Sequence, residues 1–265
     1  MKNLIKKIDQ NQSKIKSFGK LDIKILNKIN YKLRLDWNYY SNKMEGGTLT
    51  RAETQSVMVQ VIDVKGKSLK DLLEMTGHDK VITEILSIVK GEGKRISESR
   101  IKEIHKAIIH EPDSEIAKQI GIWKTVPNEI INYKGGKYSF LPPEEVTEEI
   151  HKLLNEVNAD LDKFYNNKLK KHPIEMASKF HIDFLNIHPF YDGNGRVARI
   201  LSNIILISCG FPPVIIKEEH KKIYYQLLAE IDCYGADVDL LHKFFAERMA
   251  ETQELIIEVV TEKTK

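Results

Sequence analysis

The sequence predicts a mainly α-helical protein that carries a single β-hairpin. Apolar residues recur at helical spacing through most of the 265 residues. One segment, residues 125–143, instead shows two short strand-like runs around a pair of glycines. With 42% hydrophobic and 30% charged residues, the chain is long enough to bury a sizeable core in one large domain, or in one domain plus an extension.

Within the first 35 residues, the segment around residues 21–33 predicts an amphipathic helix with a basic outer face. The first 35 residues hold ten Lys or Arg residues against two aspartates, in a chain of net charge +3. Four apolar residues recur every four positions, with lysines between them: Leu21, Ile25, Ile29 and Leu33. A nucleic-acid-binding arm is the alternative. We interpret the charge as a solvated helix face, because charge runs usually are.

Two amphipathic helices are predicted in the middle of the chain. Residues 141–165 begin with prolines and a glutamate-rich first turn, and their apolar residues then share one face. Residues 172–187 repeat apolar side chains at helical intervals. This second helix is expected to end near His188, because Pro189 disfavours helical geometry in the residue before it.

The following segment, residues 197–210, is apolar almost all round, which is typical of a helix at the centre of a domain. Further helices are predicted at about 218–232 and 237–260. The hairpin is predicted from residues 130–133 and 137–140, which flank Gly135 and Gly136. Residues 90–99 are the best candidate for a linker.

The chain is expected to be cytoplasmic, with no membrane partner. No run of eighteen apolar residues occurs, and the N-terminus alternates charged and apolar residues instead of forming a signal core. Cys209 and Cys233 lack metal-binding spacing and give no disulfide framework. About thirty residues follow residue 235, enough for one helix, so no DNA-binding domain and no nucleic-acid partner are expected.

The densest chemistry lies in HPFYDGNGRVAR, residues 188–199. Gly193 and Gly195 allow a tight turn that presents free N–H groups at the start of the buried helix, a place that favours anions. Arg196 and Arg199 are three residues apart and share a helix face, so both can bind phosphate oxygens.

Two further side chains complete a nucleotide site. Asp192 is suited to Mg²⁺, which usually takes one or two carboxylates plus substrate phosphates. His188 is the only nearby group that accepts a proton near neutral pH. The stretch lacks the Gly-Lys-Ser/Thr ending of a Walker loop. A plain glycine turn capped by Asp192 is the alternative, but it leaves the arginines and the histidine unexplained.

HPFYDGNGRVAR resembles the signature of the Fic family, H-x-F-x-D/E-G-N-G-R-x-x-R, at every defined position. The similarity covers roughly residues 95–235 and extends weakly back to residue 36. It implies a Fic-type helical domain with one β-hairpin flap and an N-terminal helical extension. The expected division is an N-terminal helical region at 1–94 with an inhibitory helix at about 36–50, a catalytic domain at 95–250, and a C-terminal helix end or tail at 251–265.

The resemblance implies transfer of AMP from ATP to a Ser, Thr or Tyr hydroxyl on a target protein, with release of pyrophosphate. His188 would deprotonate the hydroxyl, and Asp192 would hold Mg²⁺. The remaining residues of the motif would bind phosphates, with Gly193, Asn194 and Gly195 as an anion hole, Arg196 on the β- and γ-phosphates and Arg199 on the γ-phosphate.

SNKMEGG, residues 41–47, is similar to the family's inhibitory motif S/T-x-x-x-E-G/N, with Ser41 and Glu45 at its defined positions. The resemblance implies that a helix delivers Glu45 to Arg199, where its carboxylate displaces the γ-phosphate and misaligns ATP. The alternative is a surface pair between Glu45 and a lysine, worth roughly 0–1 kcal/mol.

The resemblance also assigns residues to the target and to the base. Main-chain hydrogen bonds at the hairpin edge would dock the target through Tyr138, Ser139, Phe140 and Leu141. Tyr224 and Tyr225 are similar in position to adenine contacts, although plain core packing explains them equally well. Relatives often carry asparagine where this chain has Asp232, which puts the base preference in question.

Other readings stay open at this point. AMP removal, or transfer of another nucleotide or a phosphate group, would use the same fold, and a non-catalytic interaction module is more remote. The resemblance also admits a homodimer and self-modification. His181, Asp183 and His188 are close in sequence, but they lack the spacing of a zinc site, and we expect His181 to be a packed histidine.

Overall fold

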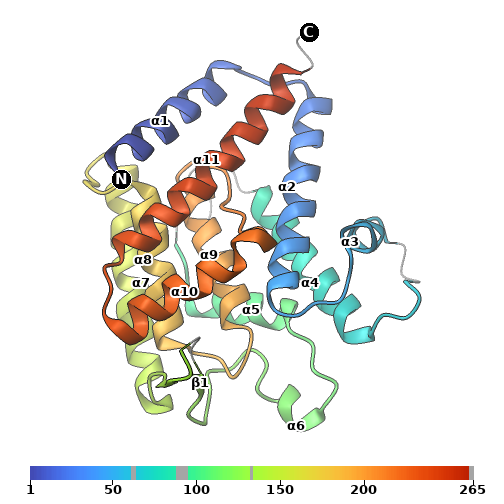
Figure 1. Cartoon of the computed structure of the whole chain (residues 1–265), viewed down its shortest axis with the longest axis vertical. Coiled ribbons are helices and arrows are strands. Elements are labelled where there is room, and N and C mark those ends of the chain that lie inside the picture. The colour runs from blue at the N-terminus through green and yellow to red at the C-terminus, as the bar shows by residue number, and fades with distance from the viewer. Residues whose placement is uncertain (61–63, 88–94, 132–133, 263–265) are drawn as a thin grey trace.

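A computed structural model describes residues 1–60, 64–87, 95–131 and 134–262. Within these residues it has eleven α-helices, one short 3₁₀-helix and one two-stranded antiparallel sheet (Figure 1), so the prediction of a mainly α fold with one hairpin is confirmed. The elements in chain order are α1 Lys2–Ser17, α2 Ile23–Met44, α3 Arg51–Met58, α4 Leu69–Leu86, α5 Glu98–Ile108, α6 Ser114–Ala117, β1 Glu129–Ile131, β2 Lys137–Ser139, α7 Pro143–Tyr165, α8 Pro173–Ile187, α9 Asn194–Ser208, η1 Glu218–His220, α10 Lys221–Tyr234 and α11 Asp239–Thr261.

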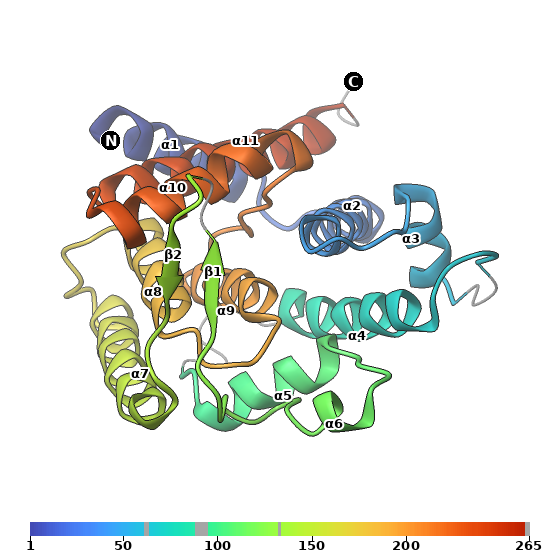
Figure 2. The ribbon, with the colours of Figure 1, turned by 60° about the horizontal axis from the view of Figure 1, so that its bottom comes forward.

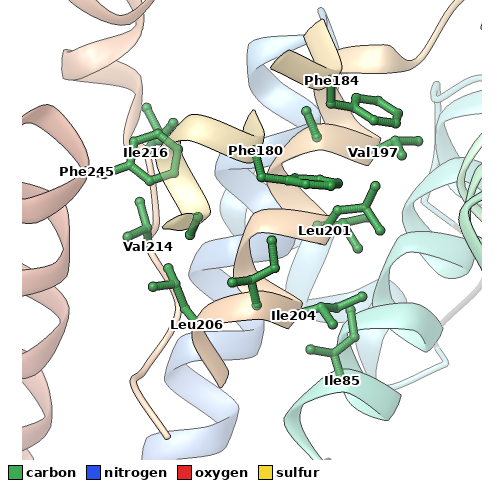
Figure 3. Close-up of a cluster of buried hydrophobic side chains, with 14 of the residues drawn as sticks. Ile85, Phe180, Phe184, Val197, Leu201, Ile204, Leu206, Val214, Ile216 and Phe245 are labelled. Carbon is green, nitrogen blue, oxygen red and sulfur yellow. The ribbon is translucent and has the colours of Figure 1, made fainter. Parts of the chain in front are cut away.

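Helix α9 lies at the centre of the core, as its apolar sequence predicts. It packs against α8 and also contacts α2, α4 and α5. Figure 3 shows side chains of α9 between those of α8, α4 and α11, including Leu201, Phe180, Ile85 and Phe245. Each fully buried side chain of this size stabilises the fold by roughly 1.5–3 kcal/mol. The N-terminus of α9 is therefore held on a rigid support.

The turn from α8 into α9 depends on two residues with positive φ. His188 ends α8 in the left-handed region, with φ 48°, and Pro189 follows it directly. Gly193 precedes α9 with φ 77°, and a Cβ at this position would lie 2.4 Å from Ile109 Cδ1. Only glycine fits there, because both the backbone conformation and the close approach of Ile109 disfavour a side chain.

The β-hairpin pairs Glu129 with Ser139, Ile130 with Tyr138 and Ile131 with Lys137. Figure 2 shows it crossing over α8 and α9. Residues 132–133, which belong to the predicted first strand, lie outside the described residues. The hairpin thus brings its second strand close to the turn that begins at His188.

The expected inhibitory helix at 36–50 differs from the structure. Helix α2 is much longer toward the N-terminus and ends at Met44, so Glu45 is its C-cap. Gly46 then takes a φ of 89° and turns the chain, and a capping box between Thr50 and Glu53 starts α3. Glu45 is consequently placed at the end of a helix, not within one.

The two ends of the chain share the main core. Helix α1 packs along α11 (Figure 1), and one buried cluster includes Ile8 of α1, Ile29 of α2 and Ile256 of α11. Helix α11 runs without a break through residue 250. Residues 88–94, which contain the first half of the expected linker, are outside the described residues. Among the helices described, none combines the length and apolar character needed to cross a membrane.

Candidate active site

A cavity of about 480 Å³ opens at the N-terminus of α9. Its polar lining comes from the end of α2 and from the 188–199 motif. Its apolar lining comes mainly from the hairpin and α10, and includes Ile131 and Leu228. Cavities that bind small molecules commonly combine an apolar wall with a few convergent polar groups. The structure therefore brings the predicted base-binding residues and all the predicted phosphate-binding residues except Arg196 to one cavity.

Arg199 is held from two sides by the end of α2. Its Nη2 donates to Glu45 Oε1 at 2.7 Å and to the carbonyl oxygen of Ser41 at 3.1 Å, and its Nε donates to Ser41 Oγ at 3.2 Å. The Arg199 side chain is only 6% exposed. Burial lowers the pKa of Arg199, but the carboxylate of Glu45 and the hydroxyl groups of Tyr224 and Tyr225 together raise it by more, so the pKa lies above its ordinary value. Arg199 is a buried cation whose charge is compensated by Glu45.

The Glu45 carboxylate also reaches the backbone at the start of α9. A Cβ on Gly195 would lie 2.7 Å from Glu45 Oε1 and 3.2 Å from Arg199 Nη1. Helix N-termini favour anions, because their N–H groups are free and the helix dipole is positive there. Arg199 Nη1 is buried and has no hydrogen-bond partner among the described residues. Glu45 is thus one anion at this site, and Arg199 Nη1 remains available to bind a further anionic group.

Arg196 takes a different direction from Arg199. It forms an ion pair with Glu74 of α4, and its Nη1 also donates to the carbonyl oxygen of Ile108. It lines a smaller neighbouring cavity of about 200 Å³, together with Glu74, Asp192 and Glu45. Arg196, expected on the β- and γ-phosphates, and Arg199, expected on the γ-phosphate, therefore line separate cavities, because α4 provides Arg196 with its own carboxylate.

His188 lines the main cavity and is held by three groups. The side-chain nitrogens of Asn128 and Asn194 lie 2.8 and 3.0 Å from its Nδ1, and the ring of Phe140 stacks on the imidazole at 3.8 Å. Burial, reinforced by the nearby Lys124 ammonium and opposed by Asp192, lowers the pKa of His188 to about 3. The imidazole is therefore neutral at physiological pH, as a general base must be.

Asp192 lines both cavities. Its Oδ1 accepts from the Gly193 N–H at 2.6 Å, and its Oδ2 has no hydrogen-bond partner within the described part of the chain. The residues that the structure describes contain no cluster of three or more His, Cys, Asp or Glu side chains that could hold a metal ion by themselves. A single available carboxylate fits Mg²⁺, which completes its coordination with substrate phosphates and water.

The three residues expected near the base line the same cavity but differ in character. Tyr224 is 1% exposed, and its hydroxyl bonds to His181 at 2.7 Å. Both of these side chains belong to the core, as expected for His181. Tyr225 is 38% exposed and faces the cavity. Burial raises the pKa of Asp232 to about 7, opposed by an amide hydrogen bond from Asn186 at 2.6 Å.

The hairpin edge contacts the catalytic histidine candidate directly. Phe140 stacks on His188, and Tyr138 packs edge-on against Phe140. Tyr138, Ser139, Phe140 and Leu141 also line a groove against α7 and α8. The expected docking residues are thus placed next to His188.

Three residues of this site have no counterpart in the sequence interpretation. Glu74, Lys124 and Asn128 are at least 60 residues away in sequence from the motif residues that they contact, which are Arg196, Pro189 and His188. No spacing pattern distinguishes any of them from the other polar residues of its segment. Only the packing of α4 and of the segment before β1 against the motif identifies them.

Residues 95–206, which include the whole motif, match the model of the Fic/DOC family. This chain contains a Fic/DOC family domain. The protein adenylyltransferase Fic of Nematostella vectensis is 32% identical over 228 residues, or 85% of this chain and 49% of that protein. The protein adenylyltransferase fic-1 of Caenorhabditis elegans is 30% identical over 191 residues, or 72% of this chain and 35% of that protein. The chain thus spans about half the length of these curated relatives, or less.

Solved Fic structures share the whole fold. A Fic-domain-containing signaling protein from Bacteroides thetaiotaomicron VPI-5482 superposes with a TM-score of 0.87 at 29% identity, covering 97% of each chain. A fragment of Fic-1 from C. elegans superposes with a TM-score of 0.81 at 23% identity, covering 99% of this chain and 73% of that one. The similarity includes the N-terminal helices as well as the Fic domain.

Proposed function

We propose that this chain transfers AMP from ATP to a Ser, Thr or Tyr hydroxyl of a target protein and releases pyrophosphate. The observation that carries the proposal is the anion seat at the start of α9, where a carboxylate is held by the buried Arg199 guanidinium beside the Gly195 backbone. The names of the relatives, protein adenylyltransferases, support this activity. The intact motif from His188 to Arg199 supports it as well.

The proposed roles of the residues follow from their positions. His188 accepts the proton of the target hydroxyl, and the oxygen then attacks the α-phosphorus of ATP. The backbone at Gly193–Gly195 and the guanidinium of Arg199 bind the phosphates. Asp192 holds Mg²⁺, which when bound neutralises phosphate charge. Arg196, held by Glu74, reaches the phosphates only from the smaller cavity.

We also propose that Glu45 inhibits the resting enzyme. Its carboxylate accepts a hydrogen bond from Arg199 Nη2. It also lies so close to Gly195 that an atom added there would clash with it. A γ-phosphate at the same place meets both steric overlap and charge repulsion. Displacement of Glu45 therefore restores the alignment of ATP with the target hydroxyl.

The test is transfer of label from ATP carrying a labelled α-phosphate, with Mg²⁺ present. Wild type, Glu45→Gly and the double variant Glu45→Gly/His188→Ala are compared on the protein itself and on cell lysate. Glu53→Gln, which changes a carboxylate at the start of α3, is the matched control and should label like wild type. We expect labelling to rise in Glu45→Gly and to disappear in the double variant.

Two other outcomes have definite meanings. Equal labelling of wild type and Glu45→Gly, with equal ATP binding by calorimetry, contradicts inhibition by Glu45. No labelling of any variant that binds ATP contradicts AMP transfer and favours transfer of another group or removal of AMP, which is then assayed by release of AMP from a modified protein.

A further inference from the structure

His188 Nδ1 receives two amide groups whose orientations are fixed elsewhere. Asn194 Oδ1 accepts from the Phe190 N–H at 2.9 Å, and its Nδ2 donates to the Phe190 carbonyl oxygen at 2.9 Å. Asn128 Oδ1 accepts from Lys124 Nζ at 2.7 Å, and its Nδ2 donates to the same carbonyl oxygen at 3.1 Å. Each amide therefore presents an N–H, and not an oxygen, to the imidazole.

This arrangement determines which nitrogen of His188 carries the proton. A neutral imidazole has one N–H donor and one acceptor nitrogen. Because Nδ1 accepts from both Asn128 and Asn194, the proton is on Nε2. Nε2 has no hydrogen-bond partner in the described residues, and His188 lines the cavity. Nε2, the nitrogen that is free to contact a substrate hydroxyl, is thus a hydrogen-bond donor in this structure. A general base instead has to present an unprotonated nitrogen that accepts the proton.

Lys124 is the residue that keeps Asn128 in this orientation. It is 3% exposed, and its ammonium contacts, within the described residues, only the Asn128 oxygen, the carbonyl oxygen of Ile187 at 3.4 Å and the face of the Phe140 ring. An ammonium group donates and never accepts, so it selects the oxygen end of the amide. No carboxylate competes for this ammonium among those contacts.

The two amides differ in their freedom to turn. Both polar atoms of Asn194 are bonded to the backbone of Phe190, so turning that amide breaks two backbone contacts. Turning the Asn128 amide breaks the contact with Lys124 and one contact with Phe190, and places its oxygen on His188 Nδ1. Asn128 is therefore the amide that turns more readily, and protonation of His188 Nδ1 also requires the Asn194 N–H to lose its contact with that nitrogen.

We propose that Lys124 and Asn128 are positioning residues that hold His188 as the Nε2–H tautomer, and that turnover requires their contact to open. The identity of the reaction rests on the proposed function, whereas the tautomer is a property of the chain alone. With Nδ1 protonated, the Nε2 lone pair takes the proton of the target hydroxyl. The hydroxyl oxygen then bonds to the α-phosphorus, the bond to pyrophosphate breaks with its electron pair, and the imidazolium later returns its proton to solvent.

Asn128→Asp tests the proposal with an almost isosteric change. The new carboxylate accepts from both the Lys124 ammonium and the His188 Nδ1–H, so it favours the opposite tautomer. A hydrogen bond to a charged group is strong enough to shift such an equilibrium by about tenfold or more. Lys124→Met removes the ammonium while keeping an apolar stem, and releases the Asn128 amide. Asn166→Asp, which adds the same charge at the exposed C-cap of α7, is the control.

The first readout is the protonation of the two ring nitrogens, measured by ¹H–¹⁵N correlation spectra of the full chain with ¹⁵N-labelled histidine. His188→Ala identifies the signals of His188. We expect a protonated Nε2 in wild type and in Asn166→Asp, and a protonated Nδ1 in Asn128→Asp. A protonated Nδ1 in wild type, or an unchanged tautomer in Asn128→Asp, overturns the proposal.

The second readout is AMP transfer in the Glu45→Gly background. We expect Asn128→Asp to raise kcat by about tenfold with an unchanged KM for ATP, and Lys124→Met to raise it less. A tautomer shift with no rise in kcat overturns the catalytic part of the proposal. A tautomer shift in a protein that transfers no AMP at all leaves the tautomer assignment intact and contradicts the proposed function instead.

Discussion

Glu45 Oε1 accepts a hydrogen bond from Arg199 Nη2 at 2.7 Å, although 154 positions separate the two residues in the sequence. Glu45 is the C-cap of α2, where the helix dipole disfavours negative charge. Its carboxylate lies at the N-terminus of α9, where the dipole favours negative charge. The contact therefore places one anion at the start of α9, where we propose that a nucleotide phosphate binds.

Gly195→Ala should not reproduce the activation expected of Glu45→Gly. Its Cβ would lie 2.7 Å from Glu45 Oε1 and 3.2 Å from Arg199 Nη1, so it expels the carboxylate but fills the space that a phosphate needs. We expect ATP binding to weaken by about tenfold or more, since a charge-assisted hydrogen bond is lost. Titration calorimetry with ATP measures this. Tight ATP binding by Glu45→Gly/Gly195→Ala would show that phosphates do not bind beside Gly195.

Asp232→Asn should change how stability depends on pH. The folded state raises the pKa of Asp232 from 3.8 to about 7, mainly through burial. The folded protein therefore binds this proton more tightly than the unfolded chain, and the stability that it contributes is present below pH 3.8 and is lost as the pH rises to about 7. Relative to wild type, Asp232→Asn should become progressively more stable across this range and then level off. Urea unfolding at several pH values measures it.

Asp237→Asn, at an exposed position after α10, is the control for that series. It measures, in the same series of pH values, the general effect of replacing an exposed aspartate by asparagine. If Asp232→Asn and wild type keep a constant difference in unfolding free energy from pH 4 to 7, then Asp232 does not titrate in this range and is not buried as described.

Leu201→Ala should destabilise the protein far more than a leucine substitution at the surface. Leu201 is 0% exposed at the centre of α9 (Figure 3), whereas Leu240 at the start of α11 is 44% exposed. Truncating a buried leucine costs about 2–5 kcal/mol, because apolar contacts are lost and a cavity remains. Leu240→Ala should change stability by about 0.5 kcal/mol or less. Similar unfolding free energies for the two variants would argue against a rigid support under the anion seat.

Local patterns in the sequence account for the elements and for most of the site. Apolar periodicity predicts α7 and α8, the nearly continuous apolar run predicts α9, and the glycine pair predicts the hairpin. These signals are local, because helical and strand periods repeat within a few residues. The motif from His188 to Arg199 is likewise one continuous stretch, and the family match of residues 95–206 includes it.

The sequence alone therefore determined the helices from α7 to α11, the hairpin and the chemistry of the motif. The family resemblance of the sequence already implied that Glu45 meets Arg199, and the two side chains are in contact in the structure. Only the tertiary structure decided that Glu74 is the partner of Arg196 and that the Lys124–Asn128 pair holds His188. These partners come from segments at least 60 residues away, and their contacts exist only because α2, α4 and the segment before β1 pack around the start of α9. The periodicity of apolar residues determines which face of a helix is buried. The partner of a buried charged side chain is instead determined by which distant elements pack against it.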